Sequence, residues 1–165
     1  MNTITSIKQK LPELIEGVSV KDLIRHPDER GFFEEIVRVS DPFFNEGFGQ
    51  LSRSFMHEGV LKAWHVHKTQ IDWWFVFRGA LHVALFDTRE NSQTYKSLVY
   101  FTWDQSEDAV LKIPAGVAHG LKVDGSEAVL TYITSKTYNP QEEGRIEPND
   151  PKLGFDWNKF APMEK

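Results

Sequence analysis

The chain has 165 residues, of which 40% are hydrophobic, and carries a formal charge of −5 with a pI near 5.7. This length predicts a single domain, the dispersed Lys and Arg residues argue against a nucleic-acid partner, and the lack of cysteine excludes disulfides and thiolate chemistry. No apolar run could span a bilayer and the N-terminus lacks a secretory signal, so a soluble, cytoplasmic protein without a membrane partner is expected.

Short apolar runs separated by turn residues follow one another along the chain, as is typical of an all-β sandwich or barrel. Short helical turns are predicted only near the start of the chain and between the second and third strands, at residues 7–15 and 42–46. Alternation and β-branched or aromatic content predict strands at residues 17–23, 31–37, 50–57, 60–67, 98–102, 109–113, 120–123 and 128–134.

Two further apolar runs, residues 73–77 and 80–86, flank the dipeptide Arg78-Gly79. A two-residue turn that contains Gly between such runs is typical of a β-hairpin. With about ten short strands and hardly any helix, a double-sheet jelly roll fits best. We expect residues 1–165 to form one domain, with an N-terminal arm at 1–20 and a C-terminal tail at 145–165.

Three histidines and an aspartate are spaced so that strand geometry would gather them. His65 and His67 stand two residues apart in a predicted strand, so their side chains project from the same face. A turn near residues 68–70 would fold Asp72 back toward them, and His119 follows a second Pro- and Gly-containing turn. The pattern therefore predicts a site inside the barrel.

The same spacing resembles the two motifs of the cupin superfamily, whose fold is the double-stranded β-helix, or jelly roll. Residues 59–79 are similar to the first motif, with Asp72 in place of the usual Glu, and residues 114–119 are similar to the second. Within that superfamily the chain resembles the dTDP-4-dehydrorhamnose 3,5-epimerase family from about residue 20 to 157. The matching segments are 28–34, 50–54, 60–65, 113–120, Tyr132, 138–140 and 143–144.

The resemblance implies an epimerase that acts without a cofactor on a nucleotide-linked 4-keto-6-deoxysugar, inverting C3, C5 or both, for polysaccharide or other deoxysugar biosynthesis. His65 would remove the proton next to the 4-keto group, and Tyr132 would return one from the opposite ring face. His119 would orient His65 or donate to the enolate oxygen. The nucleotide, the sugar and the inverted carbon stay open.

The resemblance also implies a set of substrate-binding positions. Arg30 and Phe32 would bind the nucleotide, the first through its guanidinium and the second by packing. Lys62 replaces the family's Arg, and simple alternation turns it away from His65. The remaining pocket positions are Glu34, Gln50, His67, Tyr138 and Glu143. The family's members pair through an N-terminal strand that completes the neighbour's site, so a homodimer is expected.

Two departures from the family concern charge near the base. Asp72 stands where the family has a Lys that stabilises the enolate, and the family's C-terminal Asp, which pairs with the catalytic His, has no counterpart. Asp72 or His119 would then orient His65. A rival interpretation is a metal-dependent cupin enzyme that uses His65, His67, Asp72 and His119 for manganese, iron, zinc or nickel. Another is a sugar-nucleotide binding protein without turnover.

Overall fold

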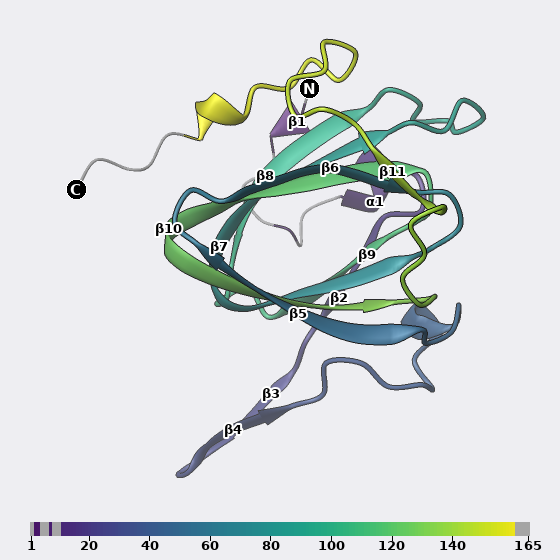
Figure 1. Cartoon of the computed structure of the whole chain (residues 1–165). Helices are drawn as coiled ribbons and strands as arrows, with labels where there is room; N and C mark the ends of the chain where they lie inside the picture. Colours follow the sequence, from purple (N-terminus) through teal and green to yellow (C-terminus); the bar gives the residue numbers. More distant parts are fainter. Residues whose placement is uncertain (1, 4–6, 8–10, 161–165) are drawn as a thin grey trace.

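The computed structural model describes residues 2–3, 7 and 11–160 of the chain, and within them the all-β class is confirmed (Figure 1). The helical elements are short: α1 at Leu11–Leu14 and the 3-10 turns η1 at Pro42–Phe44 and η2 at Trp157–Lys159. The strands are β1 (Asn2–Thr3), β2 (Ser19–Asp22), β3 (Arg25–Asp28), β4 (Gly31–Glu34), β5 (Gln50–His57), β6 (Leu61–His67), β7 (Asp72–Asp87), β8 (Leu98–Asp104), β9 (Ala109–Ile113), β10 (Val117–Thr134) and β11 (Glu143–Arg145).

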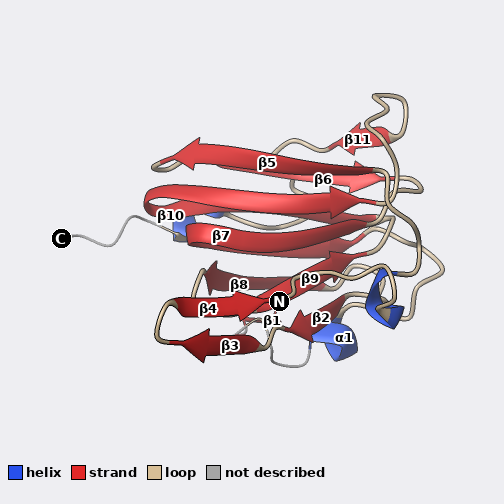
Figure 2. Cartoon of the chain, turned by 90° about the horizontal axis from the view of Figure 1, so that it is seen from below, coloured by secondary structure: helices blue, strands red, loops and turns tan. Residues whose placement is uncertain are grey.

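Two long strands, β7 and β10, run antiparallel to each other and take part in both layers of the barrel (Figure 2). The second half of β7 and the first half of β10 form one layer with β8, β6 and β11. The opposite halves form the other layer with β9, β2 and β5. This arrangement of two sheets that share bent strands confirms the predicted jelly roll.

The predicted hairpin at residues 73–86 is wrong, because β7 continues through Arg78 and Gly79. Both halves of β7 pair with β10, so the chain does not reverse there; it bends from one layer into the other. Gly79 has a φ of +79°, and a Cβ on it would lie 2.2 Å from the carbonyl oxygen of Glu127. Opposite this bend, β10 continues through a bulge. The predicted strands 120–123 and 128–134 are therefore parts of one strand.

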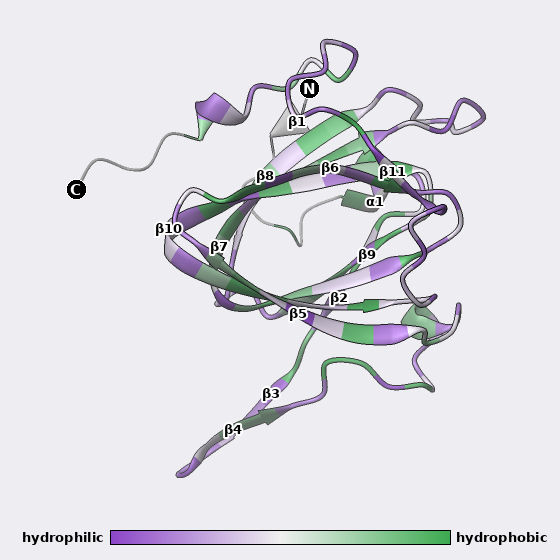
Figure 3. Ribbon diagram, in the orientation of Figure 1, coloured by the Kyte–Doolittle hydropathy of each residue, from purple (hydrophilic) through white to green (hydrophobic). Residues whose placement is uncertain are grey.

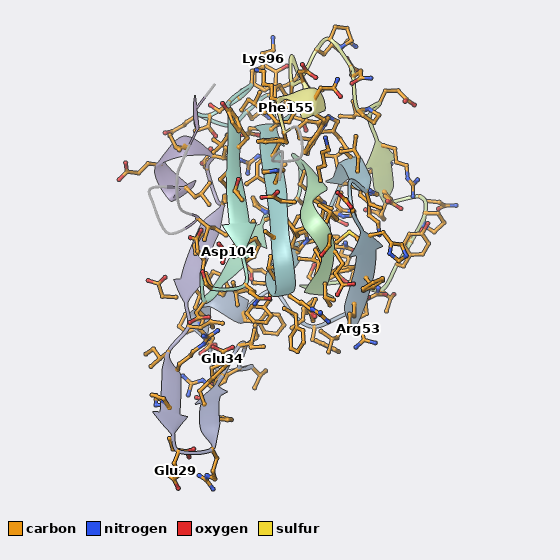
Figure 4. The ribbon with its side chains drawn as sticks, turned by 90° about the vertical axis from the view of Figure 1, so that its left-hand side faces the viewer. Glu29, Glu34, Arg53, Lys96, Asp104 and Phe155 are labelled. Atoms are coloured by element: carbon orange, nitrogen blue, oxygen red, sulfur yellow. The ribbon has the colours of Figure 1, made fainter. Side chains whose placement is uncertain are left out.

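A small hairpin of β3 and β4 extends away from the barrel (Figures 1 and 4). The predicted strand 31–37 ends at Glu34, and β3 was not predicted. Glu29 lies at the tip of the hairpin and Glu34 near its base (Figure 4). Phe32 and Phe33 are 54% and 64% exposed, so this hairpin carries apolar side chains that the described residues do not cover.

The main core lies between the two layers and includes residues from the N-terminal segment. Ile7, Leu11 and Ile15 are fully buried in it. A second cluster packs Trp64 against Phe155 and Trp157 of the C-terminal segment. The alternation of hydrophobic and hydrophilic residues along the strands is visible in Figure 3. None of the helices in the described ranges is long and apolar enough to cross a membrane.

Asp87 holds the loop between β7 and β8 in place. Its buried carboxylate accepts hydrogen bonds from Arg89, Ser92 and Thr94 at 2.8, 2.6 and 2.7 Å. Burial alone raises the pKa of this carboxyl, but these hydrogen bonds outweigh it and hold the pKa far below the ordinary value of 3.8. The stabilisation is therefore present above pH 3.8 and is lost as the pH falls below that value.

Replacing Asp87 by Asn is expected to lower the free energy of unfolding at pH 7 by about 3 kcal/mol, because the Arg89 guanidinium loses its buried partner. The difference from the wild type should be smaller at pH 3, because the carboxyl of the unfolded wild-type chain takes up a proton there while the folded one stays ionised. Urea denaturation at both pH values measures it. Asp156→Asn, at an exposed helix cap where Asn serves as well as Asp, is the control. A loss that did not depend on pH would contradict this account.

Candidate active site

A cavity of about 410 Å³ opens between the layers, walled by β5, β6, β7, β10 and β11. Nine of the twelve predicted site residues line it: Gln50, Lys62, His65, His67, Asp72, His119, Tyr132, Tyr138 and Glu143. The fold thus brings together side chains from five strands and a loop. Gln70, Trp74, Thr134 and Arg145 also line the cavity and were not predicted.

Three predicted residues, Arg30, Phe32 and Glu34, do not line the cavity of their own chain. They lie on the hairpin of β3 and β4. Arg30 pairs there with Asp28, and the guanidinium of Arg25 lies 4.2 Å from the centre of the Phe32 ring. The hairpin extends away from the barrel (Figure 4), and Arg30 and Phe32 are exposed on it. The side chain of Glu34 is only 11% exposed and accepts a hydrogen bond from Arg25.

The carboxylate of Glu143 holds His65. β11 pairs antiparallel with β6, which sets Glu143 beside His67 and Arg145 beside His65. Nδ1 of His65 lies 2.6 Å from Oε1 of Glu143. Burial raises the pKa of Glu143, but the hydrogen bond from His65 together with the nearby charges, that of Arg145 among them, outweighs burial and leaves the pKa lowered. The carboxylate therefore fixes the proton of His65 on Nδ1 and leaves Nε2 free to accept one.

The sequence pointed to Asp72 or His119 as the group that orients His65, whereas the hydrogen-bond partner is Glu143. The two residues are 78 positions apart, so only the pairing of β11 with β6 reveals the contact. Gly144 permits that pairing, since a Cβ there would lie 2.7 Å from Cγ1 of Val66. The Glu143-Gly144 dipeptide was the signal in the sequence.

Asp72 is buried and held from both sides. Its Oδ1 accepts a hydrogen bond from Nε2 of Gln70 at 2.8 Å, and its Oδ2 accepts one from Nε1 of Trp74 at 3.3 Å. Burial raises the pKa of Asp72, but His67 and His119 outweigh it, so the pKa is lowered and the group is a carboxylate at neutral pH.

His119 is a buried, neutral imidazole. Burial lowers its pKa to about 4. Its Nδ1 lies 3.1 Å from the carbonyl oxygen of Val117, which can only accept, so Nδ1 carries the proton. Nε2 then holds a lone pair and has no proton to donate into the cavity. This argues against His119 as the donor to an enolate oxygen.

Lys62 lines the cavity together with His65, although simple alternation turns the two side chains to opposite faces. The reason is a register shift between β6 and β10: His119 pairs with His65, but Leu121, two residues on, pairs with Lys62, three residues back. The bulge restores Lys62 to the inner face. The alternation argument was wrong at this position.

Tyr132 reaches the same cavity from the far half of β10. It lies between Ser52 of β5 and Trp74 of β7 in the sheet. Its hydroxyl has no hydrogen-bond partner in the part of the chain that the structure describes, so it is available to a ligand. A base on β6 and a phenol on β10 therefore line one cavity.

Comparison with known proteins gives concordant matches. A family model described as dTDP-4-dehydrorhamnose 3,5-epimerase matches residues 12–165. The spore coat polysaccharide biosynthesis protein SpsL of Bacillus subtilis is 43% identical over 148 residues, which are 88% of this chain and 97% of that protein.

Solved structures agree with that match. The dTDP sugar isomerase of Desulfovibrio desulfuricans G20 superimposes with a TM-score of 0.82 at 28% identity, covering 90% of this chain and 95% of that one. The dTDP-6-deoxy-D-glucose-3,5-epimerase of Legionella pneumophila, solved in complex with dTDP-4-keto-L-rhamnose, gives 0.78 at 28% identity, covering 87% and 79%.

Proposed function

The chain belongs to the dTDP-4-dehydrorhamnose 3,5-epimerase family, and on that basis we propose that His65 is its base and Tyr132 its acid. It is an isomerase that epimerises a nucleotide-linked 4-keto-6-deoxysugar. We also propose that residues 1–165 act as one domain, in the cytoplasm.

One observation supports the base: the 2.6 Å contact between Nδ1 of His65 and the carboxylate of Glu143. It leaves Nε2 of His65 ready to take the proton next to the 4-keto group, while the carboxylate stabilises the imidazolium that forms. The electrons of the broken C–H bond move to the keto oxygen as an enolate. Tyr132 then supplies a proton to the same carbon from the other face, which inverts it.

Two positively charged side chains that line the cavity could bind the diphosphate of the substrate. Lys62 donates from Nζ to Oγ of Ser54 at 2.7 Å, and the guanidinium of Arg145 lies 3.5 Å from Glu143. The side chain of Arg145 is 74% exposed, so its planar group is accessible to a phosphate. We propose that these two side chains bind the phosphates and that Tyr138 and Gln50 contact the rest of the nucleotide.

Solvent-deuterium exchange tests the activity directly. The protein is incubated in D₂O with dTDP-4-keto-6-deoxyglucose, and the sugar is followed by NMR. We expect deuterium to enter at C3, C5 or both, followed by the inverted product. Tight binding of several nucleotide sugars with no exchange into any of them would instead support a binding protein without turnover.

We also propose that the protein forms a homodimer. Leu51 and Phe55 of β5 and Phe77 of β7 are 60%, 53% and 64% exposed. The two strands lie on either side of β10 in the same layer. The hairpin of β3 and β4 adds two further exposed aromatic side chains, Phe32 and Phe33. Apolar side chains gathered in this way mark a protein interface. In a dimer the outward-pointing hairpin would carry Arg30 and Phe32 to the neighbour's cavity.

Replacing Leu51 and Phe55 together by Glu is expected to weaken the dimer at least about 30-fold. The reason is that dimer formation would then bury two charged carboxylates in place of two apolar side chains. Sedimentation over a range of concentrations measures the change. Tyr95→Glu, at an exposed aromatic residue outside β5 and the hairpin, is the control. A wild-type protein that sediments as a monomer at all concentrations would rule the dimer out.

A further inference from the structure

Thr88 directly follows β7 and does not line the cavity, yet it is bonded to the turn that leads into β10. Its Oγ1 donates to the carbonyl oxygen of Gly116 at 2.7 Å, and its backbone N–H donates to the same oxygen at 3.2 Å. The side chain of Arg89 packs against this glycine, where a Cβ would lie only 2.5 Å from Cγ of Arg89. Two consecutive residues therefore fix the position of Gly116.

Gly116 is in turn bonded to β6. Its backbone N–H donates to the carbonyl oxygen of His67 at 2.8 Å. Its φ of +78° belongs to a conformation that side-chain-bearing residues rarely adopt, so this link is built on a glycine. Gly116 thus joins the loop after β7 to the end of β6, two residues from the proposed base, His65.

The bond between Gly116 and His67 lies on one side of His65, and an interruption of the strand ladder lies on the other. β6 and β10 are in register where His65 faces His119, but the register shifts between His119 and Leu121. A bulge of this kind disrupts the ladder locally. The bond from Gly116 therefore supports β6 at the end where the ladder on the far side of His65 is broken.

The base and its carboxylate partner sit together at the edge of the sheet. β11 is the last strand of the layer and pairs with β6, so His65 and Glu143 belong to one unit. Tyr132, the proposed acid, lies on β10. The distance between base and acid across the cavity therefore depends on how β6 is held against β10.

We propose that Thr88 is a positioning residue: through Gly116, its hydroxyl holds the end of β6 and keeps His65 at the distance from Tyr132 that the reaction requires. Both groups have to reach the same carbon, and a displacement of about 1 Å in such a site can lower a rate about 100-fold. The effect of Thr88 on the rate rests on the proposed function. Its effect on the bond between Gly116 and His67 does not.

Replacing Thr88 by Val tests the role in the reaction, because Val keeps the β-branched shape and loses the hydroxyl. The kcat for deuterium exchange into dTDP-4-keto-6-deoxyglucose should fall about 10-fold, with KM within about 2-fold of the wild-type value. The number of dTDP molecules bound per chain, measured by calorimetry, should not change, whereas a loss of folded protein would lower it. Thr88→Ser restores the hydroxyl and should recover most of the rate.

Amide hydrogen exchange, followed by NMR on the full chain, tests the link without any substrate. The N–H of Gly116 should exchange about 10-fold faster in Thr88→Val than in the wild type or in Thr88→Ser, because its carbonyl is no longer held by the hydroxyl. Thr102→Val is the matched control, since it removes a hydroxyl that lies 3.0 Å from Nδ1 of His82. It should leave both kcat and the Gly116 amide unchanged.

The two measurements separate this inference from the proposed function. A Gly116 amide as well protected in Thr88→Val as in the wild type would overturn the positioning role, whatever the activity. So would an unchanged kcat in Thr88→Val, or a Thr88→Ser protein as slow as Thr88→Val. A wild-type protein that exchanges no deuterium into any nucleotide sugar would instead overturn the epimerase chemistry of His65 and Tyr132, while the amide measurement would still decide whether Thr88 holds Gly116.

Discussion

Replacing His65 by Asn is expected to lower the rate of deuterium exchange next to the 4-keto group about 1,000-fold or more. Asn lacks Nε2 but carries an amide N–H that can still donate to Glu143, and it cannot accept a proton at neutral pH. The enolate therefore does not form at a useful rate. The measurement is single-turnover exchange followed by NMR.

The matched control for this variant is His57→Asn, at an exposed histidine that does not line the cavity. It should exchange at the wild-type rate. Binding of the substrate to the His65 variant, measured by calorimetry, should change little, because the loss lies in proton transfer. Exchange in the His65→Asn protein within a few-fold of the wild-type rate would mean that another group is the base.

Replacing Tyr132 by Phe is expected to separate exchange from inversion. The formation of inverted product should fall about 100-fold, because the phenol that returns the proton is gone. Exchange should persist, because His65 still removes the proton and returns deuterium to the face it came from. Product analysis and exchange on the same samples give both rates.

Tyr95→Phe, at an exposed tyrosine away from the cavity, is the control for this experiment and should leave both rates unchanged. If Tyr132→Phe lost exchange and inversion equally, the phenol would be needed to form the enolate and not only to quench it. If it kept both, Tyr132 would have no part in the chemistry.

The pairing of His65 with Glu143 joins two segments that lie far apart in the sequence. Oε1 of Glu143 lies 2.6 Å from Nδ1 of His65, the proposed base. The orienting carboxylate is supplied by β11, which pairs with β6.

Local patterns in the sequence determined the fold class and most of the site. Alternation with a period of two marked β5 and β6 with nearly their observed bounds, because it reflects which face of each strand is buried. The spacing of His65, His67, Asp72 and His119 predicted a cluster, and all four line one cavity. The resemblance added Tyr132 from a strand far along the chain.

Tertiary structure alone decided which strands pair and where they bend. Arg78-Gly79 has the local signature of a turn, yet the common partner β10 makes it a bend in one strand. A bulge between His119 and Leu121 brings Lys62 into the cavity, and β11 brings Glu143 to His65 across 78 residues. Each depends on contacts between distant segments, whose free energies are not written in any short stretch of sequence.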